Sequence, residues 1–147
     1  MISFDIFTKH FLRKINEFDF ISIGQEITQD LIDSYMKSSI SKFYRVCKFD
    51  LISQNSDNRV IDSDIPDAEL YEIAEIISDG MVVQWLKPFL YNQELLESDL
   101  NTRDFTGYSS AELLRRVGEA HDTAEKRFKN AIKSYSYDVG DLEDLHL

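Results

Sequence analysis

Residues 109–135 have the sequence SSAELLRRVGEAHDTAEKRFKNAIKSY, and this stretch decides the fold class. Ser109 is followed three residues later by Glu112, which is the spacing of a capping box at the start of a helix. Apolar residues then recur every three or four positions, which places them along one side of a helix. This seam consists of Leu113, Val117, Ala120, Ala124, Phe128, Ala131 and Tyr135. We predict one long helix from Ser110 to Tyr135, whose alanine-rich side another helix can approach closely.

The region before this helix, residues 66–87, is predicted to form a second long helix. Asp64 and Pro66 are a helix-start signal, because proline fits the first turn and has no amide hydrogen to leave unpaired. The apolar residues cover more than one side, which is too much for a helix packed on one side only. Gly80 lies near the centre, where glycine costs about 1 kcal/mol relative to alanine, so we expect a close helix approach or a bend there. Pro88 is expected to end or kink the helix.

The N-terminal half is predicted to contain two shorter helices. The first runs from Ser3, a possible cap, to residue 17 or 18, because four apolar residues share one stripe. They are Phe4, Phe7, Phe11 and Ile15. The second runs from residue 25 to about 48, with Thr28 as a possible cap. Between them, residues 18–24 alternate apolar with polar, which indicates a short strand or an extended link. The polar residues at about 53–65 indicate an exposed acidic loop.

The last twelve residues, 136–147, are predicted to leave the helix, because Gly140 interrupts it. Upstream, Asn92 can cap a short helix, and residues 101–107 have the composition of a turn. Together these features predict a mainly α protein: a small helical bundle with a long C-terminal helix, an acidic loop and an extended C-terminal tail. Residues 1–135 form the single predicted domain, and residues 136–147 form a tail.

Three fates are open for the tail, which is too short to fold alone: it packs on its own domain, frays in solvent, or docks on another subunit. We take docking as the working hypothesis. The predicted interface with a portal or a neighbouring subunit is Tyr135, Tyr137, Val139, Leu142, Leu145 and Leu147. A second group of residues lies around the predicted end of the second long helix. Trp85, Pro88, Phe105 and Tyr108 are interpreted as a packing cluster where helices meet, with a protein-binding patch as the alternative.

Composition narrows the function classes. The 147 residues carry a net charge of −11, and residues 49–103 hold most of the acidic excess. Such a surface repels phosphate, which disfavours nucleic-acid binding through a basic patch. The single cysteine, Cys47, excludes an intramolecular disulfide. No uncharged apolar run approaches the length of a transmembrane helix, so we expect a soluble protein with no membrane contact.

Motifs for catalysis are scarce. The three histidines, His10, His121 and His146, lie on separate segments, and there is no cysteine pair, no HExxH and no glycine-rich phosphate loop. The pair His121 and Asp122 occurs in some metal-dependent phosphohydrolases, but further histidines upstream are missing. We therefore expect no enzyme activity, no metal and no cofactor.

Several short strings in residues 66–147 match a known pattern. They are GMVVQWLKP at 80–88, Asn92, Asp104-Phe105, YSSAELL at 108–114 and YSYDVGDL at 135–142. In these strings the chain resembles head-to-tail connector (adaptor) proteins of the tailed bacteriophage neck. None of the strings is a catalytic signature, and the first 60 residues add no matching motif.

The resemblance implies a virion structural protein that links the portal to the tail and lines the DNA passage. Its implied partners are the portal, other neck or tail proteins and further copies in a ring of about twelve. DNA would be near the ring without specific binding, at the neck of the virion, after synthesis in the host cytoplasm. The family's long helix would be Ser110–Tyr135, its portal-directed tail Ser136–Leu147 and its acidic loops Gln54–Asp67.

Two other hypotheses compete with the connector. The first is an acidic, phage-encoded regulatory protein or DNA-mimic inhibitor that binds a basic host protein, which salt-sensitive 1:1 binding would favour. The second is a small hydrolase, which would require metal-dependent turnover lost on changing His121.

Overall fold

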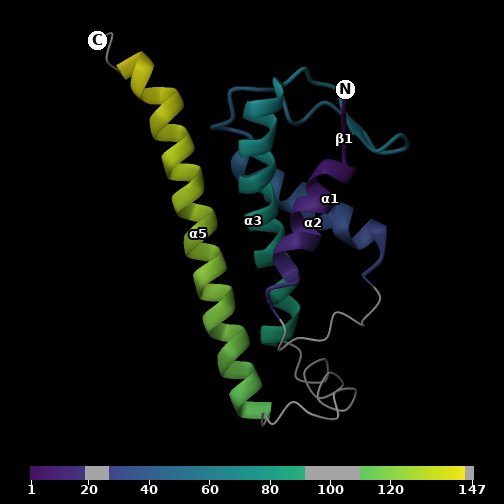
Figure 1. Cartoon of the computed structure of the whole chain (residues 1–147), viewed down its shortest axis with the longest axis vertical. Coiled ribbons are helices and arrows are strands. Elements are labelled where there is room, and N and C mark those ends of the chain that lie inside the picture. The colour runs from purple at the N-terminus through teal and green to yellow at the C-terminus, as the bar shows by residue number, and fades with distance from the viewer. Residues whose placement is uncertain (19–26, 92–109, 145–147) are drawn as a thin grey trace.

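A computed structural model describes residues 1–18, 27–91 and 110–144, and in these parts the chain is mainly helical, as predicted (Figure 1). The helices are α1 (Asp5–Ile15), α2 (Gln29–Phe43), α3 (Asp67–Tyr91) and α5 (Ser110–Asp144). The strands are β1 (Ile2–Ser3), β2 (Gln54–Asn55) and β3 (Val60–Ile61). Helix α3 contacts α1, α2 and α5, so it is the central element of the bundle. No helix in the described parts is both long enough and apolar enough to cross a membrane.

Helix α3 is buried on several sides, as its sequence predicted. Ile73, Ile77, Met81 and Leu86 are fully buried, because three other helices pack around them. Of the two expectations for Pro88, an end or a kink, the end is wrong, since α3 continues through Pro88 to Tyr91. Pro88 is exposed in the last turn of the helix, where a carbonyl that has lost its helical partner can face water at low cost.

Gly80 marks the closest approach of three helices. A Cβ atom at this position would lie 2.6 Å from Cζ of Phe128 on α5 and would also collide with the Oγ atom of Ser39 on α2. Ser39 is buried, and its hydroxyl donates a hydrogen bond of 2.7 Å to the carbonyl oxygen of Ile77. The close approach expected from the sequence is therefore confirmed, and the absent side chain is its physical cause.

The seam of α5 packs along α3 of the same chain. Leu113, Val117 and Phe128 are buried, and the alanines of the seam are buried or half-buried against the core. The predicted break at Gly140 and the extended tail are wrong, because α5 continues to Asp144. One glycine inside a helix costs only about 1 kcal/mol relative to alanine, which lowers helix stability without ending the helix.

The N-terminal helices occur where predicted, with shorter bounds. The apolar stripe of α1 faces the core, and Thr28 caps α2 by accepting a hydrogen bond of 3.2 Å from the amide of Leu31. Ser3 does not cap α1 in the usual way, since the residue at the cap position is Phe4. Ser3 Oγ instead accepts a hydrogen bond from the amide of Asp5. The expected link or strand at residues 18–24 and the expected short helix and turn at 92–107 lie outside the described residues, apart from residue 18.

The stretch predicted as a loop at 53–65 contains the hairpin of β2 and β3, to which β1 adds an antiparallel third strand. Arg59 sits at the turn with a φ of 53°, and its guanidinium pairs at 2.8 Å with both Asp5 and Asp33. Ile61 is fully buried beneath the sheet. The polar composition of residues 53–65 did not predict this hairpin. The hairpin is stabilised by one buried side chain, Ile61, and by the ion pairs of Arg59.

Candidate functional site

Tyr135, placed by the sequence in a docking interface, belongs to the core of its own domain. It is 6% exposed, and its ring packs edge-on against Phe43 of α2 at 5.0 Å between centroids. Its hydroxyl accepts a hydrogen bond of 3.1 Å from the amide of Lys48 and lies 3.8 Å from Sγ of Cys47. Burial raises the pKa of Tyr135 to about 12. Tyr135 therefore connects α5 with Phe43 at the end of α2 and with Lys48 in the segment that follows α2.

The change Tyr135→Phe is expected to destabilise the chain by about 1 kcal/mol at neutral pH, because the amide of Lys48 loses its acceptor. The pKa of Tyr135 is higher in the folded chain than its ordinary value of 10, so its contribution is complete below pH 10 and is lost as the pH rises toward 12. Urea unfolding at pH 8 and pH 11 measures both effects. Wild type should lose more stability between these values than the variant; equal losses would contradict this role of Tyr135.

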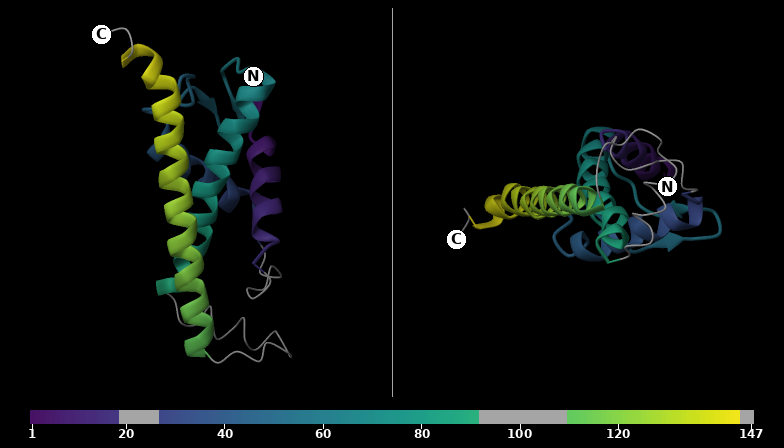
Figure 2. Two further views of the ribbon diagram at one scale, coloured as in Figure 1. Left: turned by 60° about the vertical axis from the view of Figure 1, so that its left-hand side comes forward. Right: turned by 90° about the horizontal axis from the view of Figure 1, so that it is seen from below.

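Beyond Tyr135, the last turns of α5 leave the body of the molecule. We call residues 136–144 the terminal segment. Figure 2 shows α5 extending away from the other helices toward its C-terminal end. Tyr137 is 69% exposed, while Val139 is half-buried against the core. Leu142 lies within the terminal segment. Leu145 and Leu147 lie outside the described residues.

The terminal segment is acidic and contains no lysine or arginine. Its acids are Asp138, Asp141, Glu143 and Asp144. The C-terminal end of a helix carries a partial negative charge, which disfavours acids there and favours bases. No base lies in the last turn of α5. The chain therefore ends its longest helix with a run of acids whose charge the helix itself does not offset.

The predicted packing cluster is only partly described. Trp85 is buried, and its ring contacts those of Phe11, Phe18 and Phe89 edge-on, with centroids 5.7 to 6.4 Å apart. Pro88 is exposed, while Phe105 and Tyr108 lie outside the described residues. For Trp85 the interpretation as core packing is thus confirmed, with partners from the N-terminal half that the sequence did not reveal.

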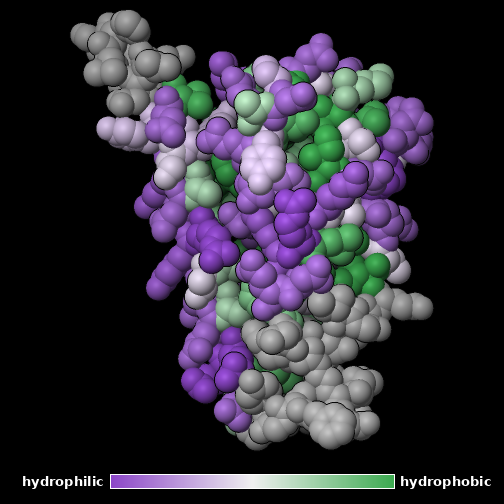
Figure 3. All heavy atoms as spheres, in the orientation of Figure 1, coloured by the Kyte–Doolittle hydropathy of each residue, from purple (hydrophilic) through white to green (hydrophobic). Residues whose placement is uncertain are grey.

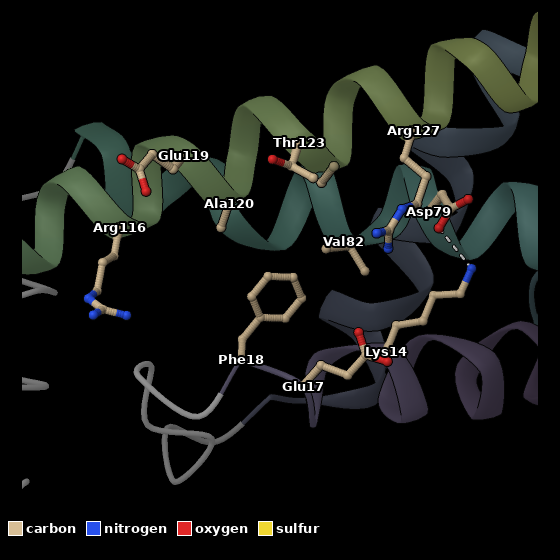
Figure 4. A pocket seen from close by; sticks show the side chains of 11 residues that line it. Lys14, Glu17, Phe18, Asp79, Val82, Arg116, Glu119, Ala120, Thr123 and Arg127 are labelled. Carbon is tan, nitrogen blue, oxygen red and sulfur yellow. Dashed lines mark hydrogen bonds and ion pairs between the residues drawn. The ribbon is translucent and has the colours of Figure 1, made fainter.

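A cleft that the sequence did not predict lies between α1, α3 and α5 (Figure 4). It has a volume of about 330 Å³. Its apolar surface comes from Phe18, Val82, Ala120 and Ala124. Its polar surface comes from Lys14, Glu17, Asp79, Arg116, Glu119, Thr123 and Arg127. We call it the α1–α3–α5 cleft.

One side of this cleft is fixed by ion pairs between α1 and α3. Lys14 Nζ lies 2.8 Å from Oδ1 of Asp79 and donates a hydrogen bond to the carbonyl oxygen of Glu75, also at 2.8 Å. His10 Nδ1 lies 2.6 Å from the Glu75 carboxylate. Burial acts to raise the pKa of Glu75, but hydrogen bonds and charge from His10 and Lys14 outweigh it and hold that pKa below its usual value. Lys14 and Asp79 are mostly buried, and each of the two charges is paired with the other.

The opposite side of the cleft is a more open surface of α5. Glu119 forms an ion pair of 3.1 Å with Arg115. Arg115 does not line the cleft, so the negative charge of Glu119 is balanced by a residue outside it. Arg127 is exposed and extends into the cleft toward Asp79 in Figure 4. Among the described residues, Arg127 makes no hydrogen bond and no ion pair.

Among the described residues, one histidine lies in a cluster of possible metal ligands, since the ligand atoms of His121, Asp122 and Glu125 lie within 4.8 Å of one another. His121 Nδ1 lies 3.9 Å from carboxylates of both Asp122 and Glu125 on the same helix. Asp122 is 78% exposed, and Glu125 also pairs with Lys129 at 3.2 Å, which is ordinary ion pairing on a helix surface. His10 is on α1, paired with Glu75, and His146 lies outside the described residues.

Comparison of the chain with protein-family models, curated proteins and solved structures returns no match. The residues and their arrangement are therefore the basis for a functional proposal. Two features lie outside the packed core of the described residues, namely the terminal segment of α5 and the α1–α3–α5 cleft.

Proposed function

We propose that this chain is a virion structural protein, a head-to-tail connector that joins the portal of a tailed phage to its tail. The proposal rests first on the strings between Gly80 and Leu142 that resemble connector proteins. It is supported by a helical bundle with a long C-terminal helix, which is the architecture that the resemblance implies.

One observation carries the proposal: the terminal segment of α5 extends away from the bundle that the described residues form. The seam of α5 is already buried against α3, and Tyr135 closes the contact with α2. The exposed Tyr137 contributes little to that core. An exposed aromatic side chain next to charged groups is typical of a contact with another protein.

The surface charge suits a position beside DNA. On the face shown in Figure 3, hydrophilic side chains cover most of α3 and α5. The net charge of −11 repels the phosphate backbone, so DNA can pass without being held. In this function the chain acts by binding its neighbours, with no catalytic step.

Co-expression with the portal protein encoded by the same genome tests this function. We expect a stable complex in which the chain is present in several copies per portal ring, measured by size-exclusion chromatography with light scattering. A portal that elutes without the chain, at any ratio of the two proteins, would contradict the proposal.

A further inference from the structure

We propose that His121, Asp122 and Glu125 of α5 form a binding site for a transition-metal cation, and that Zn²⁺ is the ion that fits their chemistry best. One ligand atom from each residue lies within 4.8 Å of the other two. None of the three residues lines the α1–α3–α5 cleft, so the site is separate from it. The metal site goes beyond the connector function, and neither proposal depends on the other.

The three side chains meet because of their spacing on one continuous helix. His121 and Glu125 are four residues apart, which places them on the same side of α5, one turn from each other. Asp122 follows His121 directly, and its carboxylate lies beside the imidazole. The expectation of no metal rested on the lack of a second nearby histidine, and two carboxylates take its place here.

The distances suit an ion that is bound by three ligands. Nδ1 of His121 lies 3.9 Å from Oδ1 of Asp122 and 3.9 Å from Oε2 of Glu125. Atoms separated in this way share a centre about 2.5 Å from each of them, whereas zinc binds nitrogen and oxygen at about 2.0 to 2.2 Å. The side chains of Asp122 and Glu125 are 78% and 42% exposed, so they can rotate to close the remaining distance.

The imidazole of His121 is held with Nδ1 toward the two carboxylates. Its side chain is only 13% exposed, so the surrounding structure restricts the ring. Distances of 3.9 Å are too long for hydrogen bonds, and Nε2 is buried without a hydrogen-bond partner among the described residues. Buried polar groups are nearly always bonded, so this ring is an exception that needs an explanation. A cation bound at Nδ1 supplies the strong polar partner that the described side chains do not.

Glu125 divides its two oxygens between Lys129 and the proposed site. Oε1 pairs with Nζ of Lys129 at 3.2 Å, while Oε2 is the oxygen that faces His121. Carboxylates that bind metals are commonly oriented by a second contact of this kind. The positive charge of Lys129 also competes with a bound cation, so we expect moderate affinity rather than the tight binding of a buried zinc site.

The donor atoms decide which ion is preferred. Imidazole nitrogen suits zinc, copper, iron and nickel, whereas magnesium and calcium prefer sites made of oxygen atoms. Zinc accepts one nitrogen and two carboxylate oxygens and completes its four ligands with water, which the exposed side of Asp122 admits. The net charge of −11 also raises the concentration of cations near the chain. We therefore expect Zn²⁺ to bind and Mg²⁺ to bind much more weakly.

Titration of the full-length, tag-free chain with zinc chloride tests the site, with isothermal calorimetry as the measurement. We expect one zinc ion per chain and a dissociation constant below about 100 µM. His121→Ala and Glu125→Gln should each weaken binding about tenfold or more, because each removes one of three ligands. Matched controls that remove a histidine or an acid outside the cluster, His146→Ala and Glu119→Gln, should bind zinc as wild type does.

Nuclear magnetic resonance of the histidine rings gives a second measurement on wild type, which does not depend on the folding of any variant. Zinc should shift the ring signals of His121 and leave those of His10 and His146 unchanged. The site is overturned if zinc does not bind below about 100 µM, if the shifts appear only at the other two histidines, or if both variants bind like their controls. Binding of magnesium chloride as tight as that of zinc would also contradict a site that uses imidazole.

Discussion

Replacing Gly80 by alanine is expected to destabilise the folded chain by about 2 kcal/mol, although alanine is the better helix former. The added Cβ would lie 2.6 Å from the ring of Phe128 and would collide with the hydroxyl of Ser39. Neither neighbour moves easily, since Phe128 is buried and the Ser39 hydroxyl is bonded to the Ile77 carbonyl. The steric cost of about 3 kcal/mol therefore exceeds the gain of about 1 kcal/mol in helix propensity.

Gly118 provides a matched control for this experiment. It also lies inside a helix, but a Cβ there meets no atom within 4 Å. Gly118→Ala should therefore stabilise the chain by up to about 1 kcal/mol. Urea unfolding, followed by circular dichroism, compares the two variants with wild type. Shifts of the same sign for both glycines would contradict the close approach of α2, α3 and α5 at Gly80.

Ending the chain at Tyr135 is expected to abolish assembly with the portal while leaving the fold intact. Of the described side chains that are removed, Tyr137 is exposed and Val139 is only half-buried, so little of the described core is lost. We expect a loss of stability of about 1 kcal/mol from Val139. The helical content lost should be that of the terminal segment alone. Loss of the portal complex, measured by co-purification from co-expressing cells, is the expected functional result.

A shorter control separates docking from folding. A chain that ends at Ile132 also loses Tyr135, with its hydrogen bond to Lys48 and its contact with Phe43. This control should be destabilised by several kcal/mol, as for the removal of a buried aromatic side chain. If the chain ending at Tyr135 bound the portal as wild type does, the terminal segment would not be the docking element.

The positions of the helices were predictable where the sequence pattern involves only residues that are close together in the chain. The seam from Leu113 to Tyr135 and the cap at Thr28 depend on residues within one or two turns of each other, so the sequence reveals them directly. The close approach at Gly80 was predictable, because glycine inside a helix lowers helix stability and close packing with another helix can offset that loss. The end of α5 was not predictable from Gly140, since one glycine changes helix stability without deciding where a helix stops.

The functional surfaces were predictable only in part. Tyr135 shares its helical spacing with the core residues and was also assigned to the docking tail. The seam assignment was correct, because the end of α2 reaches that turn. The cleft depends on residues as distant as Lys14, Asp79 and Arg127, which only the packing of three helices brings together. A single signal was present in the sequence: α5 has bases before Tyr135 and only acids after it.

The most direct measurement for the connector function is electron microscopy of the assembled particle. We expect a closed ring of this chain between the portal and the tail, with the terminal segment of each copy in contact with the portal. A particle whose neck contains no density for this chain would contradict the central claim.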